Sequence, residues 1–576
     1  MGYSYCMTLK NLLLFLLLFI PTAHAADVNG YTAKYECKAG GTYCNVDVAT
    51  YTAAACQQTI TTGAAWSTIN WSNNVICLAN GDHTAKGTLT LGSSGTSGTR
   101  KVLRYYRASD TDDEPWNQSA GNRATIKQLA ANGVSYWIIH RITTHQTSND
   151  YSVSAATGSS NIIFNRVYDY DPHGGEIIYI NNASDITVQN SVLTDAIIDS
   201  YFERIGVSIC DAPNTHIVNN EIYDYGAHNV QIGPCSPQAG YVFENNDLYE
   251  SPAMYTNCSG TYTPSDPDSP CVAVKTILSL KDYGTSISPT KVIHNRFWGG
   301  RFTDGSINGD GASGSAVAMG TGGVGYSNYI LFQNNLVFDS QSGIEWTMWF
   351  ECNYSGNYDS NIGNIYYRIN NFKGGATTSA AWWAGCGGVN TNEFYLNTLI
   401  DVDAVSEGSF GTNNDFRCNV SIDSGAYTTG GSGTQIDYNV YYGSTDSGET
   451  HKLGNYTLST RANLTVYSLG AIIRTGAVSG CTTATDTACF LYKVTTAGTS
   501  AGSYPGYTTT LGGSTTDGTM VVKAIRGPYS FKRKLRTVSG GETFVIPYAK
   551  AHTSVPEKSF CPSTYADRTG IGIGDE

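Results

Sequence analysis

The chain has 576 residues, of which only 14% are charged, and its formal net charge is −13 at pH 7. Globular proteins average about 25% charged residues, so the polar surface of this chain is mostly uncharged. An acidic chain of this kind has no electrostatic footprint for nucleic acid or for an anionic membrane, and we expect neither as a partner.

The N-terminus has the features of a secretory signal. Lys10 precedes the apolar run LLLFLLLFI, and the following PTAHA offers an A-x-A cleavage site after Ala25. The run is too short for a comfortable membrane span, and no second long apolar run follows. We therefore expect residues 1–25 to be a signal peptide, and the rest of the chain to be a soluble monomer that is secreted or periplasmic.

Cysteine usage also points to export. The chain has 15 cysteines, and loss of Cys6 with the signal leaves an even number, as is typical of disulfide-bonded exported proteins. No cysteine–histidine spacing fits a zinc site. Several cysteines lie close in sequence and predict local loop staples, although sequence does not fix their pairing: Cys37 and Cys44, Cys210 and Cys235, Cys258 and Cys271, Cys352 and Cys386, and Cys481 and Cys489.

Residues 26–98 contain four of these cysteines and the stretch LANGDHTAKGTLTLGSSGT. The terminal units of a repetitive protein are atypical, because they cover the open end of its core. We therefore predict that this region forms an N-terminal cap and the first coils of a repetitive body.

From residue 160 onward a short unit recurs, with a strand-like run, an asparagine and usually an apolar residue two positions later, as in NIIFNRVYD. The intervals between these asparagines run from 20 to 49 residues, which is typical of a solenoid with inserted loops. The neighbouring residues are β-branched or aromatic, which favours strands over helices. The asparagines are Asn165, Asn190, Asn220, Asn246, Asn295, Asn334, Asn370, Asn397, Asn419 and Asn439.

Asparagine tolerates the left-handed backbone conformation that a sharp corner between strands requires. Asparagines at one position of every coil can also form hydrogen bonds along the stack. We therefore predict an all-β solenoid over residues 99–450, with an asparagine ladder at one corner. Residues 451–576 lose the repeat and are rich in Thr, Gly and Ser, which predicts a C-terminal cap or a small β-rich appendage.

The recurring asparagine unit resembles the right-handed parallel β-helix of pectate-lyase-like proteins, over roughly residues 100 to 445. The resemblance implies the fold. It says little about chemistry, because many functions share one fold.

The three longest intervals between asparagines run consecutively from Asn246 to Asn370. Loops inserted in a solenoid project on one side, and binding sites form where such loops flank a sheet. A second strand can be aligned in five coils, as GVSIC, NVQIG, ILSLK, AVAMG and GIEWT. Alternation along it predicts an inward column of Val207, Val230, Leu278, Val317 and Ile344, and two outward columns, Ser208, Gln231, Ser279, Ala318 and Glu345, and Cys210, Gly233, Lys281, Gly320 and Thr347.

In the last column Lys281 stands between two glycines, so one basic group projects from a trough that a polymer can cross. This arrangement resembles β-helical alginate and dermatan-type lyases, in which a lysine and an arginine about one coil apart carry the reaction. The resemblance implies that Lys281 is the base of a β-elimination on a uronic-acid polymer, and that Arg301 binds the carboxylate. Two features depart from that family: Val274 and Thr276 stand where it carries acidic calcium ligands, and the arginine lacks the R-H-G context.

Other residues near this zone have alternative interpretations. Lys281 itself is otherwise a solvated lysine at a strand end, and His228 is otherwise a corner residue that makes one backbone hydrogen bond. Lys275 is a weaker basic candidate. The candidates for substrate binding are Gln231, His228, Arg296, Glu345 and Trp346.

Two acidic clusters bear on a metal site. Oxygen ligands from neighbouring coils can hold Ca²⁺, which would screen a uronate carboxylate. Their spacing fits no EF-hand loop, and turn-forming aspartates also account for the pattern. Calcium is therefore the one cofactor expectation, with its ligands undefined. The clusters are Asp169, Asp171 and Glu176, and Asp195, Asp199 and Glu203.

Two further functions remain open beside the lyase. A glycoside hydrolase on the same fold needs two carboxyl groups across the scissile bond, but the N-T-D, D-D, G-H-G and R-I-K motifs of polygalacturonase-like enzymes are missing. A non-catalytic protein that binds carbohydrate or forms an adhesive fibre would use tryptophans as stacking faces, unless these pack in the core. The tryptophans concerned are Trp346, Trp349, Trp382 and Trp383.

Overall fold

The computed structural model describes most of the repetitive body and of the C-terminal region. The signal peptide predicted at residues 1–25 lies outside the described residues. The described ranges are 48–105, 123–145, 151–169, 176–194, 205–225, 228–233, 240–251, 276–281, 284–286, 288–300, 315–319, 326–340, 342–346, 355–370, 379–427, 431–444, 454–532 and 543–552.

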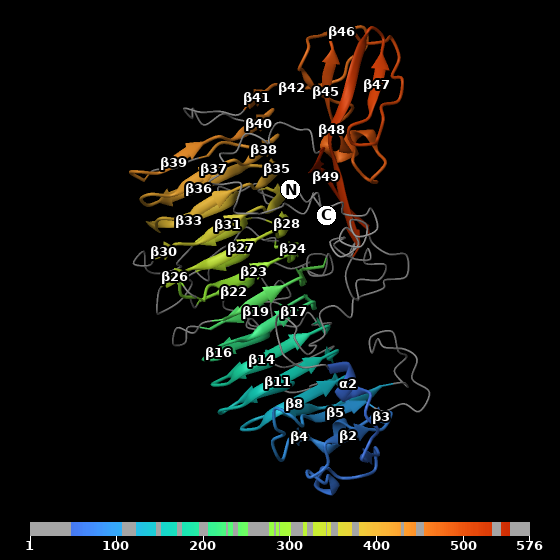
Figure 1. Cartoon of the computed structure of the whole chain (residues 1–576), viewed down its shortest axis with the longest axis vertical. Coiled ribbons are helices and arrows are strands. Elements are labelled where there is room, and N and C mark those ends of the chain that lie inside the picture. The colour runs from blue at the N-terminus through green and yellow to red at the C-terminus, as the bar shows by residue number, and fades with distance from the viewer. Residues whose placement is uncertain are drawn as a thin grey trace, which may run out of the picture.

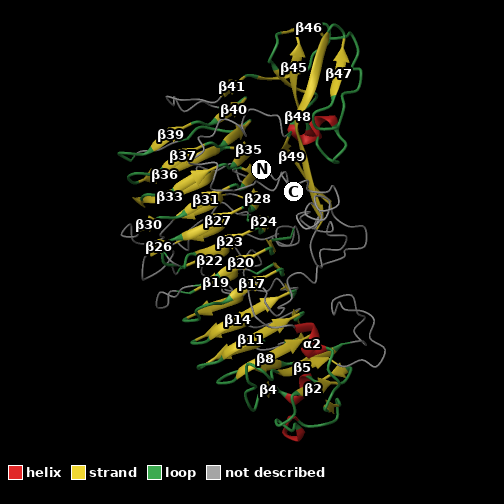
Figure 2. Cartoon of the chain, viewed as in Figure 1, coloured by secondary structure: helices red, strands yellow, loops and turns green. Residues whose placement is uncertain are grey.

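Three long sheets, here named A, B and C, form the body of the molecule, and Figure 2 shows their strands stacked in parallel rows. Sheet A has 14 strands. In stacking order they are β1 (Gln58–Ile60), β2 (Val75–Leu78), β5 (Lys101–Tyr105), β8 (Ser135–His140), β11 (Ser160–Asn165), β14 (Ser184–Gln189), β17 (His216–Val218), β20 (Val242–Glu244), β23 (Thr290–Ile293), β27 (Ile330–Gln333), β31 (Ser360–Ile362), β34 (Glu393–Tyr395), β37 (Asp415–Arg417) and β39 (Gln435–Asp437).

Sheet B also has 14 strands. They are β3 (Gly81–Asp82), β6 (Ala124–Ile126), β9 (Thr143–Thr144), β12 (Tyr168–Asp169), β15 (Val192–Thr194), β18 (Glu221–Tyr223), β21 (Asp247–Tyr249), β24 (Arg296–Trp298), β28 (Leu336–Ser340), β32 (Ile365–Ile369), β35 (Thr398–Val402), β38 (Val420–Ile422), β40 (Val440–Tyr442) and β41 (Gly454–Tyr456).

Sheet C has 11 strands and carries the residues singled out for function. They are β4 (Thr88–Thr90), β7 (Gln128–Ala130), β10 (Val153–Ala156), β13 (Glu176–Asn181), β16 (Ile205–Cys210), β19 (His228–Ile232), β22 (Thr276–Leu280), β25 (Ser315–Met319), β29 (Ser342–Trp346), β33 (Ala380–Val389) and β36 (Ala404–Phe410).

The chain winds through the three sheets in turn. Each strand pairs in parallel with the strand one full coil further on, as β8 does with β11 and β11 with β14. Parallel crossovers of this kind are right-handed. The stack runs from the N-terminal coils, blue in Figure 1, to the orange coils near β40. The predicted all-β fold, a right-handed parallel β-helix, is confirmed.

One hydrophobic core fills the inside of the coils. The inward residues predicted on sheet C, such as Val207, Val230 and Leu278, are fully buried in it together with rings from sheet A such as Phe243 and Phe332. Burying such side chains stabilises the fold by about 1.5–3 kcal/mol each. Since every coil contributes to the same core, the coils stabilise one another.

An asparagine ladder runs along the corner between sheets A and B. In each step the Nδ2 of one asparagine donates to the Oδ1 of the next, at 2.8–3.2 Å. The same Oδ1 also accepts the backbone N–H of the preceding asparagine, as Asn295 does from Asn246 at 2.9 Å. The predicted ladder is therefore confirmed, with the members Asn220, Asn246, Asn295, Asn335, Asn364, Asn397, Asn419 and Asn439.

Two details of the prediction are wrong. Asn335 and Asn364 occupy the positions assigned to Asn334 and Asn370. The left-handed corner is formed by the residue before each ladder asparagine, and its type varies. The reason is that the corner turns first, and the next side chain then reaches inside to satisfy backbone groups of neighbouring coils, as Asn246 does with Ile217 O. The corner residues include Asn219, Asn245, His294, Asn334, Leu396, Cys418 and Tyr438, with φ between 53° and 59°.

Asn165 and Asn190 also lie outside the ladder. The Nδ2 of Asn190 donates to Asn165 Oδ1 at 2.8 Å, which forms a short run beside it. Asn190 occupies the left-handed corner with φ 53°, and Ser191 stands at the ladder position, where its backbone N–H donates to Asn220 Oδ1.

The C-terminal region forms a separate, mostly antiparallel sheet of six strands beside the last coils. Its strands are β42 (Leu458–Thr460), β44 (Ile472–Arg474), β45 (Leu491–Thr496), β47 (Ser514–Asp517), β48 (Met520–Lys532) and β49 (Thr543–Ala551). Two small pairs complete the strands: β43 (Val466–Tyr467) with β46 (Gly498–Thr499), and β26 (Tyr326–Asn328) with β30 (Ser355–Asn357).

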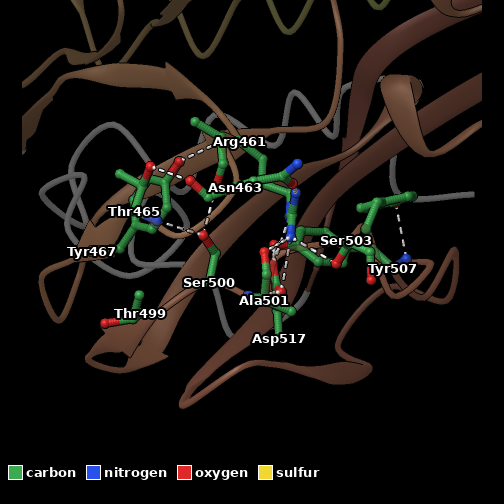
Figure 3. Close-up of polar contacts among 12 residues, drawn as sticks. Arg461, Asn463, Thr465, Tyr467, Thr499, Ser500, Ala501, Ser503, Tyr507 and Asp517 are labelled. Atoms are coloured by element: carbon green, nitrogen blue, oxygen red, sulfur yellow. Dashed lines mark hydrogen bonds and ion pairs between the residues drawn. The ribbon is translucent and has the colours of Figure 1, made fainter.

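A buried ion pair holds the base of this C-terminal sheet together (Figure 3). Arg461 Nε donates to Asp517 Oδ2 at 2.7 Å, and Arg461 Nη2 to Asp517 Oδ1 at 3.0 Å. Asp517 also accepts the Tyr507 hydroxyl at 2.6 Å. These donors hold the pKa of Asp517 below its usual value against the opposing effect of burial. The cluster therefore satisfies every partner internally and is structural.

The long hairpin of β48 and β49 packs against the outer face of sheet B, and Figure 1 shows it running back along the stack. Phe544 contacts Trp298 with ring centroids 5.2 Å apart, and Phe531 contacts Phe338 at 5.8 Å. Trp298 is itself stacked on Tyr249 at 4.1 Å. The predicted β-rich appendage is thus joined to the solenoid through sheet B.

Helices are short within the described part of the chain, and none is long and apolar enough to cross a bilayer. The helical segments are α2 (Val48–Thr52) and the 3₁₀ turns η2 (Trp66–Thr68), η3 (Thr84–Lys86), η6 (Val478–Gly480) and η7 (Thr487–Cys489).

Two disulfides are described. Cys481–Cys489 closes an eight-residue loop and confirms that predicted staple, and Cys56–Cys77 ties two segments near the first coils. Cys210 and Cys418 are also disulfide-bonded. The candidate partner Cys235 lies outside the described residues, so its pairing stays a prediction.

Candidate functional site

The outer face of sheet C has the register that the sequence predicts. Val207 pairs with Val230, Val230 with Leu278, Leu278 with Val317, and Val317 with Ile344. The neighbouring outward column therefore runs through Ser208, Gln231, Ser279, Ala318 and Glu345, because adjacent residues of a strand point to opposite faces.

Lys281 directly follows β22 on this face and is half-buried. Its backbone N–H donates to Ile232 O at 3.1 Å, and Gly233 N–H donates in the same way to Ile209 O at 2.7 Å. Lys281 therefore stands beside Gly233, its predicted neighbour in this column. Gly320 and Thr347, which complete the predicted column, lie outside the described residues.

Gln231 is half-buried on the strand next to Lys281, whereas Ser208 and Ser279 on either side of it are buried. An amide side chain can both donate to a carboxylate and accept from a hydroxyl. Gln231 and Lys281 are therefore neighbouring polar groups that solvent reaches at this part of the face.

His228 begins β19 and is buried against the next coil. Its Nδ1 lies 3.0 Å from the backbone oxygen of Thr276 and 2.9 Å from the Thr276 hydroxyl. A carbonyl oxygen only accepts, so Nδ1 is the donor in the contact with Thr276 O. His228 thus joins β19 to β22, the strands of Gln231 and Lys281.

Arg296 lies on sheet B, away from this face. Its Nε and Nη2 donate to both oxygens of Asp247, at 2.6 and 2.7 Å, and its guanidinium lies 4.4 Å from the ring of Phe531. Arg296 and Lys281 follow one another closely in sequence but belong to different sheets, since a coil changes sheet at every corner. The structure does not bring them together.

The remaining sequence candidates are described only in part. Glu345 and Trp346 belong to β29, and Glu345 is in register with Ala318 and Trp383. Their side chains are outside the described structure, and so are the whole of Arg301, Lys275 and Trp349.

The two tryptophans of β33 have opposite surroundings. Trp382 is fully buried in the core, where it meets Phe394 at 4.8 Å and Tyr366 at 5.6 Å. Trp383 is half-buried, in register with Glu345 on one side and Glu407 on the other. Trp382 therefore packs, and Trp383 belongs to the outer face.

Glu407 on β36 was missed by the sequence reasoning. It is half-buried, and burial raises the pKa of its carboxyl group. The segment AVSEGSF has the strand alternation of the other units, but it follows the last long insertion and was not aligned with them. Aligning this segment with AAWWAGCGG, the strand that carries Trp382 and Trp383, would have placed Glu407 next to Trp383.

On the N-terminal side of Lys281, the face carries a pair of tyrosines. Tyr179 on β13 stacks on Tyr151 with centroids 4.2 Å apart and rings nearly parallel. Glu176 on the same strand is half-buried, and burial raises the pKa of its carboxyl group while a hydrogen bond from Ser208 opposes the rise. Aromatic side chains therefore lie on both sides of Lys281 along the stack.

The described residues include no set of ligands for the predicted calcium ion. Asp169 lies on sheet B, where it accepts the Thr144 hydroxyl, and Glu176 lies on sheet C. Within the described ranges no cluster of three or more potential ligands could hold a metal ion. The other four acidic residues, Asp171, Asp195, Asp199 and Glu203, lie outside these ranges, so calcium stays a prediction.

Fold and face together define a parallel β-helix protein with a long polar sheet face that carries aromatic groups. Solved structures similar to the chain include pectate lyase Pel9A, with TM-score 0.35 and 12% identity over 59% of this chain and 80% of that one. An alginate lyase from Paenibacillus sp. str. FPU-7 has a TM-score of 0.29 and 14% identity, over 69% of this chain and 99% of that one. A tailspike protein of E. coli bacteriophage HK620 has a TM-score of 0.35 and 12% identity, over 76% of this chain and 84% of that one.

No protein-family model matches the sequence, and no curated protein does. At this level of structural similarity the solved structures carry no argument about chemistry. The fold stands on the strand pairing itself.

Proposed function

We propose that the protein is an exported polysaccharide lyase that cleaves a uronic-acid-containing glycan by β-elimination, with Lys281 as its base. One observation carries the proposal: the described strands of sheet C contain no lysine or arginine, and Lys281 adds one half-buried amine in the middle of their outer face. An amine on a face whose described strands carry no other basic side chain is the candidate for the base.

The reaction requires a neutral amine near the proton α to the uronate carboxylate. Lys281 removes this proton, and the electron pair forms a carbon–carbon double bond as the glycosidic C–O bond at the β carbon breaks. The leaving oxygen takes up a proton, so the products are one chain with a new reducing end and one chain with an unsaturated end.

Charge that develops on the carboxylate must be stabilised by donors or cations. Gln231 lies on the neighbouring strand and can donate from its amide, while the hydrogen bond of His228 to Thr276 keeps the two strands in register. Arg301, and Ca²⁺ if it is bound, are proposed for the same task from the sequence.

A glycoside hydrolase is the second candidate, and it rests on the column Glu345–Trp383–Glu407. Neighbouring strands lie about 4.8 Å apart, so the two glutamate positions are about 10 Å apart along the column. Inverting hydrolases place their carboxyl groups roughly 6.5–9.5 Å apart.

The test is an assay of the secreted protein against uronic-acid and neutral polysaccharides. Ultraviolet absorbance follows unsaturated ends, and a reducing-sugar assay follows all cleavage. Reducing ends that appear together with unsaturated products support the lyase. Reducing ends alone would establish the hydrolase, and binding without either product would show a non-catalytic carbohydrate-binding or adhesive protein.

A further inference from the structure

We propose that Trp383 and Glu407 form a subsite for an uncharged sugar unit of the bound glycan. This deepens the proposed function, on which it rests for the polymer that it names: a mixed polysaccharide in which a neutral sugar stands a few units from the uronate that is cleaved.

Trp383 offers a stacking face to the outside. Its neighbour Trp382 points into the core, so alternation sends Trp383 to the outer face. Among the described residues, Trp383 packs against none of the hydrophobic clusters, although it is only half-buried. A large ring of this kind on the outer face is suited to the apolar C–H face of a sugar.

Glu407 stands directly beside this ring. It is in register with Trp383, and its carboxylate takes part in no hydrogen bond or ion pair with the rest of the described chain. The close approach of the two strands is fixed one residue later, where a Cβ on Gly408 would lie 2.1 Å from Ala384 O. Only glycine fits there, with φ +95°, so the tryptophan and the carboxylate are held side by side.

The charge of the subsite selects the sugar. An ionised carboxylate only accepts hydrogen bonds, so Glu407 pairs with hydroxyl groups and repels a second carboxylate. A uronate is therefore disfavoured at this place, whereas a neutral hexose meets both a stacking face and acceptors.

The spacing places this subsite on the track of the same polymer as Lys281. Three strand steps, about 14 Å, separate β22 from β33 along the stack. Tyr179 stands in the same outward column, three steps from β22 in the other direction. A glycan that runs along the solenoid axis over sheet C would thus cross Lys281 between two aromatic faces.

Calorimetric titration with neutral and uronic hexasaccharides tests the subsite. The neutral set has gluco-, manno- and galacto-configured members, and the acidic set has oligogalacturonate and oligomannuronate. We expect a neutral hexasaccharide to bind, and Trp383→Ala to weaken it about ten-fold while Trp383→Phe retains part of the affinity. Glu407→Gln should weaken the neutral ligand and strengthen the acidic one, because repulsion is removed. Tyr504→Ala, which alters an exposed tyrosine between β46 and β47 of the C-terminal region, is the matched control and should change neither.

Equal affinity of Trp383→Ala and wild type for every neutral ligand would overturn the subsite, and so would weaker acidic binding in Glu407→Gln. The proposed function fails separately. Binding of a neutral sugar through Trp383 without cleavage of any uronic polymer would retain the subsite and refute the lyase.

Discussion

Burial sets the protonation of His216, which begins β17 on sheet A. Burial lowers the pKa of the His216 imidazole to about 4. Nearby Lys291 also lowers this pKa, whereas Asp185 raises it. The unfolded chain has a histidine pKa of about 6.5. Between these values the unfolded chain binds a proton that the folded one excludes, so stability is fully present above about pH 6.5 and is lost as the pH falls towards 4.

His216→Gln removes this contribution, because glutamine does not titrate. We expect the free energy of unfolding in urea to fall less between pH 7 and pH 4.5 in the variant than in the wild type. Urea unfolding of both proteins at several pH values measures the difference. Parallel pH profiles would show that His216 does not couple protonation to stability.

At the level of single residues, the sequence predicts the position of Lys281 and Gln231 but not that of Arg296. Side chains of a strand alternate between its two faces, so the pattern of apolar residues alone predicts how β19, β22 and β25 align. Whether a residue twenty positions later returns to the same sheet depends on where the intervening corners fall. Arg296 therefore lies on sheet B, paired with Asp247.

At the scale of the structural element, the asparagine ladder repeats in successive coils, at the corner between sheets A and B. Each member is fully buried and satisfies backbone and side-chain groups of its neighbours, as Asn295 does with Asn246, Asn335 and Phe243 O. Its place could be predicted because one residue type recurs. The shift at Asn334 and Asn335 could not, because both are asparagines, and only the backbone distinguishes the corner from the position after it.

Asn295→Ala leaves several buried donors and acceptors without partners. We expect a loss of about 3 kcal/mol in the free energy of unfolding, since each unsatisfied buried group costs about 1–3 kcal/mol. Asn132→Ala is the matched control: this asparagine is exposed, and its replacement should cost no more than about 0.5 kcal/mol. Urea unfolding followed by circular dichroism compares the two, and equal losses would contradict the role of the ladder.

At the scale of the whole molecule, the C-terminal hairpin and the proposed substrate face lie on different sheets. The hairpin of β48 and β49 covers sheet B, where Phe531 and Phe544 pack on Trp298 and Phe338. The proposed substrate face lies on sheet C instead. This arrangement could not be predicted from the sequence, because contacts between residues 193 to 246 positions apart leave no periodic trace.

Phe531→Ala removes a buried ring from the hairpin contact. We expect it to destabilise the protein by about 3 kcal/mol and to expose β48 and β49 to protease, while the rate of polysaccharide cleavage stays at the wild-type level at temperatures where the variant is folded. Limited proteolysis and the cleavage assay measure the two effects. Loss of cleavage in a folded variant would place the chemistry on sheet B instead.

The most direct measurement is the ultraviolet absorbance of unsaturated products released by Lys281→Ala from a uronic-acid polysaccharide that the wild type cleaves. Lys291→Ala is the matched control, because that lysine is exposed on sheet A. The loss of a general base predicts a fall of about 10²–10⁴-fold for Lys281→Ala and wild-type rates for Lys291→Ala. Full activity of a folded Lys281→Ala would contradict the assignment of the catalytic base.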